Sequence, residues 1–273
     1  MPELPEVETV RLGLEHWCLN RSISAVELLH PRATNPRSLA PISTVTGATI
    51  KNIARRGKFL WFELDRPLTL VAHLGMSGQF RVVPDGALDE KHLRARFVLD
   101  QSELRFIDQR TFGWLAVCEM RGDLPELVTA IAADLFDPAF DRASVVRRIK
   151  SKKSEIKRVL LDQRVMSGVG NIYADESLWR AKIHPQSPAD SLSIHKIGAL
   201  LDAANFVMSQ SLLEGGTSFD SLYTNVNGQS GYFAHSLEAY GREDQPCSRC
   251  GHQIRRIAFA GRSSHLCPKC QRL

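Results

Sequence analysis

Residues 1–7 read MPELPEV, and this stretch gives the first prediction for the chain. A small residue after the start methionine favours removal of that methionine, which would leave Pro2 with a free secondary amine. An α-amine has a reference pKa of about 7.7–8.0 and attacks electrophilic carbon to form an iminium. The next residue, Glu3, supplies a carboxylate that can carry protons to and from the reacting groups. The stretch therefore predicts a nucleophile beside an acid–base group.

A second interpretation of the same stretch involves no chemistry. Met-Pro openings are common, and Glu3 and Glu6 suit a helix N-terminus because the free N–H groups there favour negative charge. As long as Met1 stays attached, the Pro2 nitrogen is a tertiary amide and is not nucleophilic. These residues alone leave both interpretations open.

Helical periodicity begins directly after this opening. Apolar residues recur at three- and four-residue spacings, namely Val7, Val10, Leu14 and Trp17. Pro5 lies near the first turn, where its missing N–H does no harm. The reactive pair is therefore expected at the open end of a helix that an apolar stripe anchors.

Length and composition limit the class of protein. With 273 residues the chain exceeds the usual size of one domain, so two compact units are expected. Its 43% hydrophobic and 24% charged residues are typical of a globular protein with true cores. No segment approaches the about 18 uninterrupted apolar residues of a membrane span, and the N-terminus lacks the layout of a signal peptide. We therefore expect a cytoplasmic protein.

Positive charge is concentrated in two segments. Residues 241–273 hold seven Arg or Lys against two acidic residues, and residues 141–160 hold eight against two. The formal net charge of the whole chain is +5, so the remainder is acidic overall. Such clustering predicts a polyanionic partner, with nucleic acid ahead of an acidic membrane.

The region after the first helix contains many short strand patterns. They are rich in β-branched and aromatic residues, and Gly, Pro, Asp or Ser separates them. This spacing predicts an antiparallel sandwich or barrel. The predicted strands are Arg21–His30, Val45–Arg55, Lys58–Leu64, Leu68–Leu74, Gln79–Val83, Leu93–Leu99, Glu103–Ile107 and Trp114–Glu119. In the third of them, Leu60, Phe62 and Leu64 are expected to share one face.

Three turns in this region carry residues of interest. Lys58 follows Gly57 at a predicted hairpin, where a lysine can pair with a phosphate, move a proton or simply protect a sheet edge. The other two turns expose Met76 in one case, and Arg110 with Phe112 in the other. Apolar residues on loops serve as wedges in proteins that bend duplex DNA. The alternative is that Met76 and Phe112 fold back into the core.

A helical region follows a plausible linker near residue 135. Helices are predicted at Ser154–Gln163 and Asn171–Ala181, with a glycine-containing connection between them. Free N–H groups at Asn171 could hold a phosphate, although any αα-hairpin has similar spacing. Ile172, Trp179 and Ile183 are expected on one face. A further amphipathic helix contains Ile197, Leu200, Leu201, Ala204, Val207, Met208 and Leu212, and a polar loop at 215–233 follows it.

The last segment contains four cysteines in two pairs. Cys247-x2-Cys250 and Cys267-x2-Cys270, separated by sixteen residues, fit the pattern of a four-thiolate zinc site. Four protein ligands leave no open position, so one structural Zn²⁺ is expected. Disulfides are the alternative, which a reducing cytoplasm disfavours. Cys18 and Cys118 lie in apolar contexts and are expected to be buried.

Taken together, these motifs resemble the bacterial formamidopyrimidine-DNA glycosylase family, whose relatives include endonuclease VIII. The similarity spans essentially the whole chain. The residues that carry it are 2–9, 56–58, 73–78, 108–113, 168–174, 231–233, 240–242 and the four paired cysteines.

The resemblance implies a catalytic role for four residues. Pro2 would attack C1′ of a damaged nucleotide flipped from the duplex, with Glu3 as proton donor and acceptor. Lys58 would assist the first elimination and Arg262 the second, so that the strand is cut on both sides of the lesion.

The resemblance also implies a DNA-binding surface. Met76, Arg110 and Phe112 match residues that fill the gap and contact the orphaned base. Loop 217–232 resembles the one that closes over an oxidised purine. The other implied DNA contacts are His73, His92, Asn171 and one of Lys152 and Lys153.

The implied fold is an α+β multidomain protein. Residues 1–134 would form a catalytic domain of an N-terminal helix and an antiparallel β-sandwich, and residues 135–143 a linker. Residues 144–233 would form a helix-two-turn-helix DNA-binding domain that includes the capping loop, and residues 234–273 a four-cysteine zinc-finger β-hairpin.

The implied activity is that of a bifunctional DNA glycosylase/AP lyase of base excision repair. It would remove oxidised purines, such as 8-oxoguanine and formamidopyrimidines, through a Schiff base on the N-terminal proline. We expect a monomer that associates with the nucleoid through damaged double-stranded DNA. Two alternatives stay open: an endonuclease VIII-like enzyme for oxidised pyrimidines, and a non-catalytic damaged-DNA-binding protein.

Overall fold

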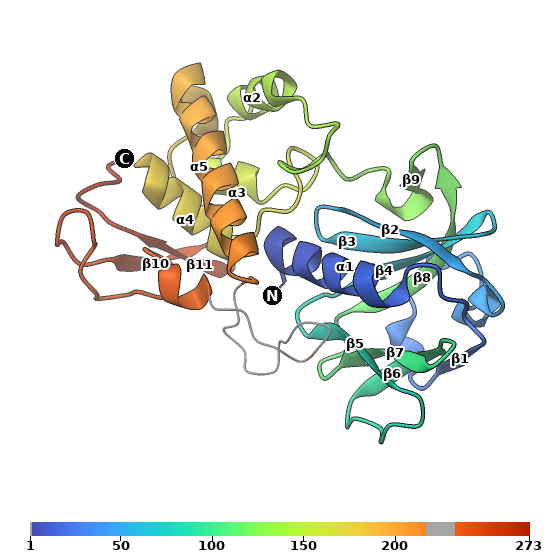
Figure 1. The fold of residues 1–273 in the computed structure, drawn as a ribbon. Helices are drawn as coiled ribbons and strands as arrows, with labels where there is room; N and C mark the ends of the chain where they lie inside the picture. The colour runs from blue at the N-terminus through green and yellow to red at the C-terminus, as the bar shows by residue number, and fades with distance from the viewer. Residues whose placement is uncertain (1, 217–232) are drawn as a thin grey trace. The chain divides into compact units, whose positions relative to one another are not determined.

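The computed structural model describes residues 2–216 and 233–273 of the chain (Figure 1). Contacts divide the chain into two compact units, one containing the residues up to Ala130 and the other beginning at Ile131. Gly215 and Gly216 belong with the first unit. No helix among the described residues is both long enough and apolar enough to cross a bilayer. The predicted capping loop, residues 217–232, lies outside the described residues.

The first unit opens with helix α1, Leu4–Cys18. Glu3 is its N-cap, Pro5 lies in the first turn, and the Glu3 N–H donates to Glu6 Oε2 over 2.8 Å. This bond satisfies one of the donors that a helix N-terminus leaves without an intrahelical partner.

The buried stripe of α1 differs from the predicted one at its last position. Val7, Val10 and Leu14 are buried as expected, but Trp17 is 49% exposed. Cys18, four residues after Leu14, continues the buried line instead, because a four-residue step stays closer to the same helix face. The burial predicted for Cys18 is thus confirmed, and the inward position predicted for Trp17 was wrong.

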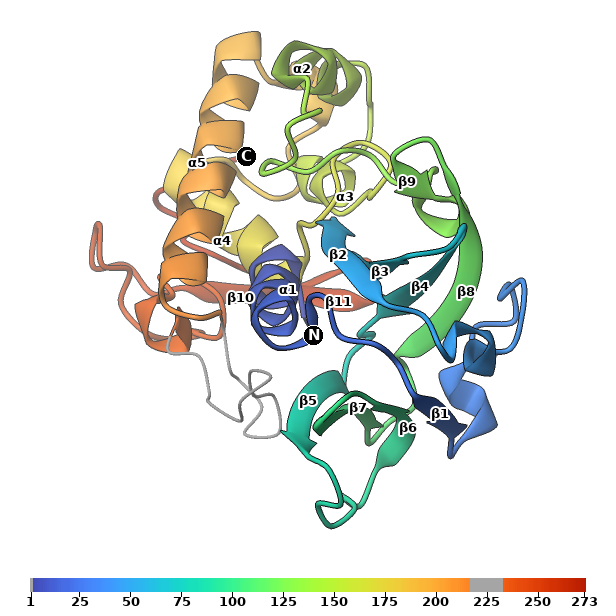
Figure 2. The same ribbon diagram turned by 45° about the vertical axis from the view of Figure 1, so that its right-hand side comes forward.

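Two antiparallel sheets form the rest of this unit (Figure 2). One has the order β1-β6-β7-β5, and the other has the order β2-β3-β4-β8-β9. All eight predicted strands are present, and a two-residue ninth strand follows them. Their bounds are β1 Ala25–Leu28, β2 Ile50–Arg56, β3 Phe59–Leu64, β4 Leu68–His73, β5 Gly78–Pro84, β6 Leu93–Val98, β7 Ser102–Asp108, β8 Trp114–Arg121 and β9 Leu124–Pro125.

One hydrophobic core joins the two sheets and α1. Phe80 of β5 meets Phe62 of β3 at a ring-centroid distance of 5.8 Å and Phe106 of β7 at 5.2 Å. Leu60, Phe62 and Leu64 are buried on one face of β3 as predicted. Val7, Val10 and Leu14 of α1 enter the same cluster. Because each fully buried aliphatic or aromatic side chain contributes about 1.5–3 kcal/mol, the helix that carries Pro2 and Glu3 is firmly anchored to the sheets.

The second unit contains four helices and one hairpin among its described residues (Figure 1). The helices are α2 Arg142–Lys150, α3 Ile156–Leu160, α4 Asn171–Ala181 and α5 Ile194–Leu213, and strands β10 Arg255–Phe259 and β11 Arg262–Leu266 form the hairpin. The bounds of α4 agree with those predicted, and Ile172, Trp179 and Ile183 are all buried. Short 3₁₀ turns complete the chain at Pro31–Ala33, Ile42–Val45, Glu126–Val128, Ala189–Ser191 and Phe233–Ser236.

Two helices differ from the sequence prediction. Helix α2 was not predicted, because only Val145 and Ile149 of its nine residues are buried. Helix α3 is shorter than the predicted Ser154–Gln163. The Gln163 side chain explains this early end, because it donates to the carbonyls of Leu161 and Val169 and so stabilises the connection to α4 rather than a further helical turn.

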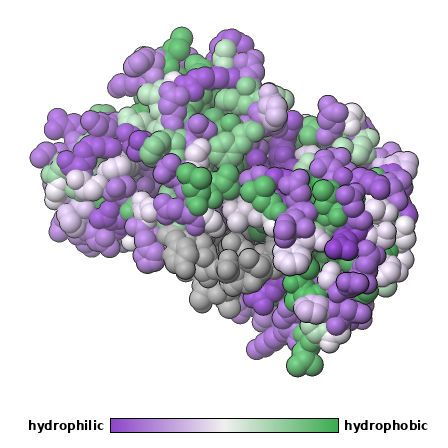
Figure 3. All heavy atoms as spheres, in the orientation of Figure 1, coloured by the Kyte–Doolittle hydropathy of each residue, from purple (hydrophilic) through white to green (hydrophobic). Residues whose placement is uncertain are grey.

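The visible face carries mostly hydrophilic side chains, among which apolar residues form separate patches (Figure 3). Large exposed apolar residues of the described chain include Met76 and Phe112. Both belong to the turns for which the sequence left the position of the side chain open.

Candidate functional site

The predicted nucleophile and its carboxylate lie at the start of α1. Pro2 and Glu3 are buried, and the exposed fraction of Glu3 is 1%. Gly216 also approaches this turn: a Cβ at that position would lie 3.2 Å from Glu6 Cγ. Its φ of +87° and this close approach both favour glycine. The chain just before residues 217–232 therefore lies against the first turn of α1.

An ion pair fastens α1 to the hairpin that carries Lys58. Arg55, at the end of β2, donates through Nε to Glu8 Oε2 over 2.7 Å, and its Nη1 donates to the Gly57 carbonyl over 3.1 Å. The pair is largely buried, with side-chain exposures of 6% for Arg55 and 16% for Glu8. Arg11 binds the same Glu8. The sequence did not identify this link, because the partners are 47 residues apart.

His73 ends β4 and lies in an aromatic cluster. Its ring stacks on Trp114 at 5.7 Å and contacts Phe59 at 4.8 Å. Burial, together with the positive charge of Lys58, lowers the pKa of His73 from 6.5 to about 4. Nδ1 accepts the N–H of Gly75 over 3.1 Å, so the neutral ring carries its proton on Nε2. His73 is thus suited to donate an uncharged hydrogen bond to a phosphate.

The depressed pKa of His73 predicts a pH-dependent stability. As pH falls from 6.5 toward 4, the unfolded chain binds a proton that the folded ring excludes, so stability is full above pH 6.5 and declines through this window. In the wild type we expect the free energy of unfolding to fall by about 2 kcal/mol across this window, a figure discounted for partial exposure. His73→Gln should remove this fall. Urea denaturation at a series of pH values measures it, with the exposed His16→Gln as control. An equal decline in wild type and His73→Gln would contradict the prediction.

The two turns with apolar tips keep them in solvent. Met76 is 44% exposed and Phe112 50% exposed, so the alternative in which they fold into the core was wrong. The Arg110 guanidinium lies 4.8 Å from the centroid of the Phe112 ring. The two turns also touch: a Cβ on Gly75 would lie 2.3 Å from the Phe112 carbonyl oxygen, so only glycine fits there.

A buried carboxylate holds both turns in place. Asp108 is fully buried, and its Oδ1 accepts the Ser77 hydroxyl at 2.5 Å, the Arg110 N–H at 3.1 Å and the Thr111 N–H at 3.0 Å. Its Oδ2 accepts the N–H of Gly113 at 2.7 Å. Thr111 has a φ of +53°, which a residue with a Cβ adopts only when its neighbours fix it. Sequence reasoning placed Asp108 in the turn but assigned it no role.

Replacing Asp108 is expected to release both turns. Asp108→Asn puts an amide against backbone donors that need an acceptor, which should lower the free energy of unfolding by about 2–4 kcal/mol. We also expect at least about tenfold weaker binding to a duplex containing an abasic-site analogue, because the tips are no longer fixed. Urea denaturation and fluorescence anisotropy measure the two effects. The exposed Asp100→Asn is the control, and equal affinities for the two variants would refute this role.

The remaining predicted DNA contacts of the first unit and of α2 lie at or near the surface. His92 is half-buried just before β6, and its carbonyl accepts the Asp108 N–H over 2.9 Å. Lys152 and Lys153 are exposed after α2, beside the basic residues of that helix. Both lysines can therefore reach a polyanion.

Asn171 and Arg262 line one groove in the second unit. Asn171 begins α4 and donates through Nδ2 to the Ser263 carbonyl over 3.1 Å. Its Oδ1 is buried without a hydrogen-bond partner among the described residues. Arg262 begins β11 and is exposed. The other residues that line this groove are Tyr240, Gly241, Glu243, Arg256, Ser263 and His265.

A buried ion pair holds β11 against the helices. Lys157 Nζ and Asp175 Oδ1 are 2.7 Å apart, and both side chains are fully buried. Lys157 also donates to the Ser263 carbonyl, and Asp175 accepts the Ser264 hydroxyl at 2.7 Å and the His265 N–H at 2.8 Å. Sequence reasoning did not detect this network, which fixes the strand that starts with Arg262.

A second buried carboxylate, that of Glu176, lies next to Asp175 on α4. It accepts three backbone N–H groups, from Glu238, Ala239 and Tyr240, at 2.7–3.0 Å. Burial nevertheless raises the pKa of Glu176 to about 7. Helix α4 therefore holds the segment that leads into the zinc-finger region as well as β11.

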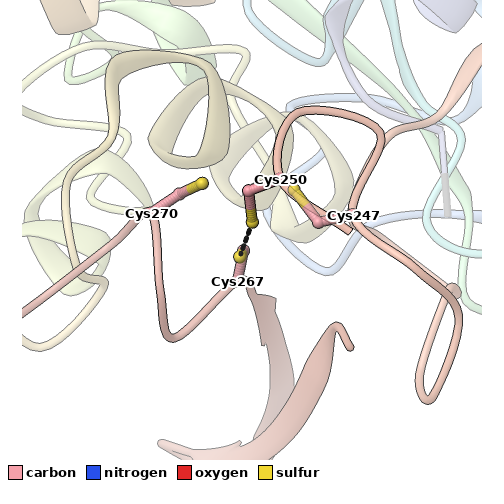
Figure 4. Close-up of side chains that lie close together, drawn as sticks. All are labelled: Cys247, Cys250, Cys267 and Cys270. Carbon is pink, nitrogen blue, oxygen red and sulfur yellow. Dashed lines mark hydrogen bonds between the residues drawn. The ribbon is translucent and has the colours of Figure 1, made fainter. Parts of the chain in front are cut away.

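The four paired cysteines converge on one point (Figure 4). Their Sγ atoms all lie within 4.8 Å of one another, and those of Cys250 and Cys267 are 3.5 Å apart. Tetrahedral zinc with Zn–S bonds of about 2.3 Å places its sulfurs about 3.8 Å apart, so this donor set fits the ion. None of the six cysteines forms a disulfide bond in the structure, which favours the zinc interpretation over the disulfide alternative. The cluster supports the predicted structural zinc.

An N-terminal helix on two antiparallel sheets, a helical unit and a hairpin beside a four-cysteine cluster together define a multidomain protein of the zinc-finger class. Comparison with known proteins identifies its family. Residues 1–115 match the formamidopyrimidine-DNA glycosylase N-terminal domain, residues 131–222 its H2TH domain, and residues 244–273 the zinc finger found in FPG and IleRS.

Whole-chain relatives give the same result. The formamidopyrimidine-DNA glycosylase of Rhodococcus opacus is 54% identical over all of this chain and 97% of its own length, and that of Salinispora arenicola is 51% identical over 99% and 96%. Among solved structures, a mutant of Lactococcus lactis FPG in complex with Fapy-dG-containing DNA matches with a TM-score of 0.90 and 35% identity, covering 100% of both chains. The chain therefore belongs to the formamidopyrimidine-DNA glycosylase family, whose members are DNA glycosylases of base excision repair.

Proposed function

We propose that this chain is a bifunctional DNA glycosylase/AP lyase that removes oxidised purines, including 8-oxoguanine and formamidopyrimidines, from double-stranded DNA. The observation that carries the proposal is the placement of Pro2 and Glu3 at the anchored first turn of α1, which the Arg55–Glu8 pair fastens to the hairpin of Lys58. Relatives more than 50% identical over nearly the whole chain bear the name of this activity.

The chemistry assigned to the first unit begins at Pro2. Its amine attacks C1′ of the flipped nucleotide, the glycosidic bond breaks, and the base leaves with a proton that Glu3 supplies. Glu3 then takes the proton of the Pro2 nitrogen and passes it to O4′, the C1′–O4′ bond of the sugar ring breaks, and an iminium forms at C1′. The iminium acidifies the C2′ proton, and loss of that proton expels the 3′ phosphate. Lys58 assists this first elimination.

The second unit contributes the later elimination and a phosphate contact, and residues of the first unit fill the vacated stack. Arg262 assists the elimination that expels the 5′ phosphate, and Asn171 holds a phosphate near the lesion. Met76, Arg110 and Phe112 occupy the vacated stack, which offsets the few kcal/mol that base flipping costs. His73, His92 and one of Lys152 and Lys153 contact the DNA backbone.

The wider biology follows from this activity. We propose that the protein acts as a monomer, since one enzyme engages one lesion, and that it works in the cytoplasm on nucleoid DNA. We propose also that the chain divides into a catalytic domain (1–134), a linker (135–143), a helix-two-turn-helix domain (144–233) and a zinc finger (234–273). The zinc ion supports the hairpin and leaves no coordination position for substrate.

Borohydride trapping tests the proposal. The protein is incubated with a duplex that carries one 8-oxoguanine opposite cytosine, and borohydride reduces any Schiff base that forms. Peptide mass spectrometry then identifies the residue that carries the DNA adduct. A covalent adduct on Pro2 is expected.

A thymine-glycol duplex is the competing substrate, because a wild-type Lactococcus lactis relative, 34% identical, has been solved with DNA containing an oxidised pyrimidine. An adduct only on thymine glycol would move the assignment to pyrimidines. Tight binding without an adduct on either duplex would favour a non-catalytic damage-binding protein.

A further inference from the structure

Helix α4 presents a buried line of polar groups to the zinc-finger region. Asn171, Asp175 and Trp179 follow one another at four-residue steps and so lie on one face of the helix. Asn171 and Asp175 bind the backbone or hydroxyl groups of β11. Trp179 continues the line, but its hydrogen-bond acceptor is a cysteine sulfur. The indole Nε1–H donates to Cys247 Sγ over 3.4 Å.

We propose that Trp179 is an outer-sphere residue of the zinc site, which positions the Cys247 sulfur and withdraws charge from it. An indole N–H is a donor only, and a buried tryptophan normally finds an acceptor for it. Trp179 is 7% exposed and Cys247 1% exposed, so water has little access to replace either the donor or the acceptor of this hydrogen bond. Sequence periodicity assigns Trp179 only to an apolar face.

The finger itself fixes the orientation of the indole. Arg249, between the first two cysteines, stacks its guanidinium 4.0 Å from the centroid of the Trp179 ring. Its Nη1 donates to the Trp179 carbonyl over 3.0 Å. The same side chain therefore holds the ring by cation–π stacking and binds the C-terminal end of α4, where cations are favoured.

A second link binds the other cysteine pair to the same helix end. Gln271 donates through Nε2 to the Ile183 carbonyl over 2.9 Å, and its Oε1 accepts the N–H of Cys267 at 2.9 Å. Trp179, Cys247 and Cys267 also share one apolar cluster with Ala239 and Ile254. Hydrogen bonds thus link both cysteine pairs to residues 179–183. Trp179, which lies outside the finger, donates directly to the sulfur of a zinc ligand.

The electrostatic role of this bond follows from the charge of the site. Four thiolates on one divalent cation leave two negative charges in an apolar surrounding, and a donor to one sulfur stabilises that charge. Outer-shell partners of this type typically change metal affinity by about 10–100-fold when they are removed. We therefore expect Trp179 to slow zinc loss.

The first experiment measures zinc transfer from the intact, zinc-loaded chain to an excess of a chromophoric chelator. Trp179→Phe, which lacks the donor, is expected to release zinc about tenfold faster than wild type. Trp17→Phe is the matched control, because it makes the same change at an exposed position of the first unit. Equal rates for the two variants would overturn the proposal.

Loss of packing alone could also speed release, so a second variant isolates the hydrogen bond. Benzothienylalanine at position 179 keeps nearly the shape of indole but replaces the N–H with sulfur. Hydrogen bonds to ligand sulfurs tune metal–thiolate sites, so in the cobalt-substituted protein its removal should shift the sulfur-to-metal charge-transfer band to longer wavelength. A shifted band together with about tenfold faster zinc release supports the proposal. An unshifted band, whatever the release rate, contradicts it.

Discussion

Blocking the Pro2 nitrogen is expected to abolish covalent trapping on damaged DNA. A variant that retains one extra residue before Pro2 turns the secondary amine into a tertiary amide, which cannot form an iminium. Base excision should fall by at least about a thousandfold, the scale on which nucleophile removal acts in enzymes of this efficiency. Affinity for a duplex with an abasic-site analogue should change by less than about threefold, because binding uses other residues. Single-turnover excision, borohydride trapping and anisotropy measure the three quantities.

Pro2→Gly provides the matched control for this experiment. It changes the same residue but leaves a primary α-amine, which also forms a Schiff base. Trapping should persist in Pro2→Gly and disappear in the extended variant. Substantial excision by the extended chain would assign the nucleophile to another residue, such as Lys58.

Breaking the buried Lys157–Asp175 pair is expected to cause the largest loss of stability in the second unit. Lys157→Met leaves the Asp175 carboxylate buried and without its cation, which typically costs about 3–5 kcal/mol. The strand that begins with Arg262 should loosen at the same time, because both partners bind β11. Chemical denaturation measures the first effect, and hydrogen exchange of the β10–β11 amides measures the second.

A surface pair supplies the control for Lys157→Met. Arg121 and Glu126 approach to 2.5 Å but are 67% and 45% exposed, so Arg121→Met should cost less than about 1 kcal/mol. The double variant Lys157→Met/Asp175→Leu should recover part of the loss, since it removes the unpaired charge. If Lys157→Met were no more costly than Arg121→Met, the buried pair would not be what holds the strand.

Much of the architecture could be predicted because the relevant signals are local. The strand segments are short and rich in β-branched and aromatic residues, β6 alternates buried and partly buried side chains, and turn residues separate the strands. Helix α4 was placed correctly because Gly170 ends the preceding connection and a periodic segment follows. The zinc site could be predicted from the spacing of four cysteines along the chain, without knowledge of the fold.

The parts that were missed depend on partners far away in the chain. The roles of Asp108, Glu8 and Arg55 follow from hydrogen bonds that the sequence does not encode locally. Buried charges such as Lys157 look like part of a solvated basic run until the fold supplies Asp175. The burial predicted for Trp17 was wrong because that prediction used only the local periodicity. Periodicity alone does not determine which face of the last helical turn packs against the core.

The neutral state of His73 has a consequence for the way affinity responds to ionic strength. Each phosphate that a lysine or arginine neutralises releases condensed counterions, and the logarithm of affinity then falls by about 0.9 per neutralised phosphate for each tenfold rise in salt. An uncharged imidazole donor holds a phosphate without displacing that ion atmosphere. Near neutral pH, His73 would therefore contribute a contact that persists as salt rises, whereas contacts made by basic side chains weaken.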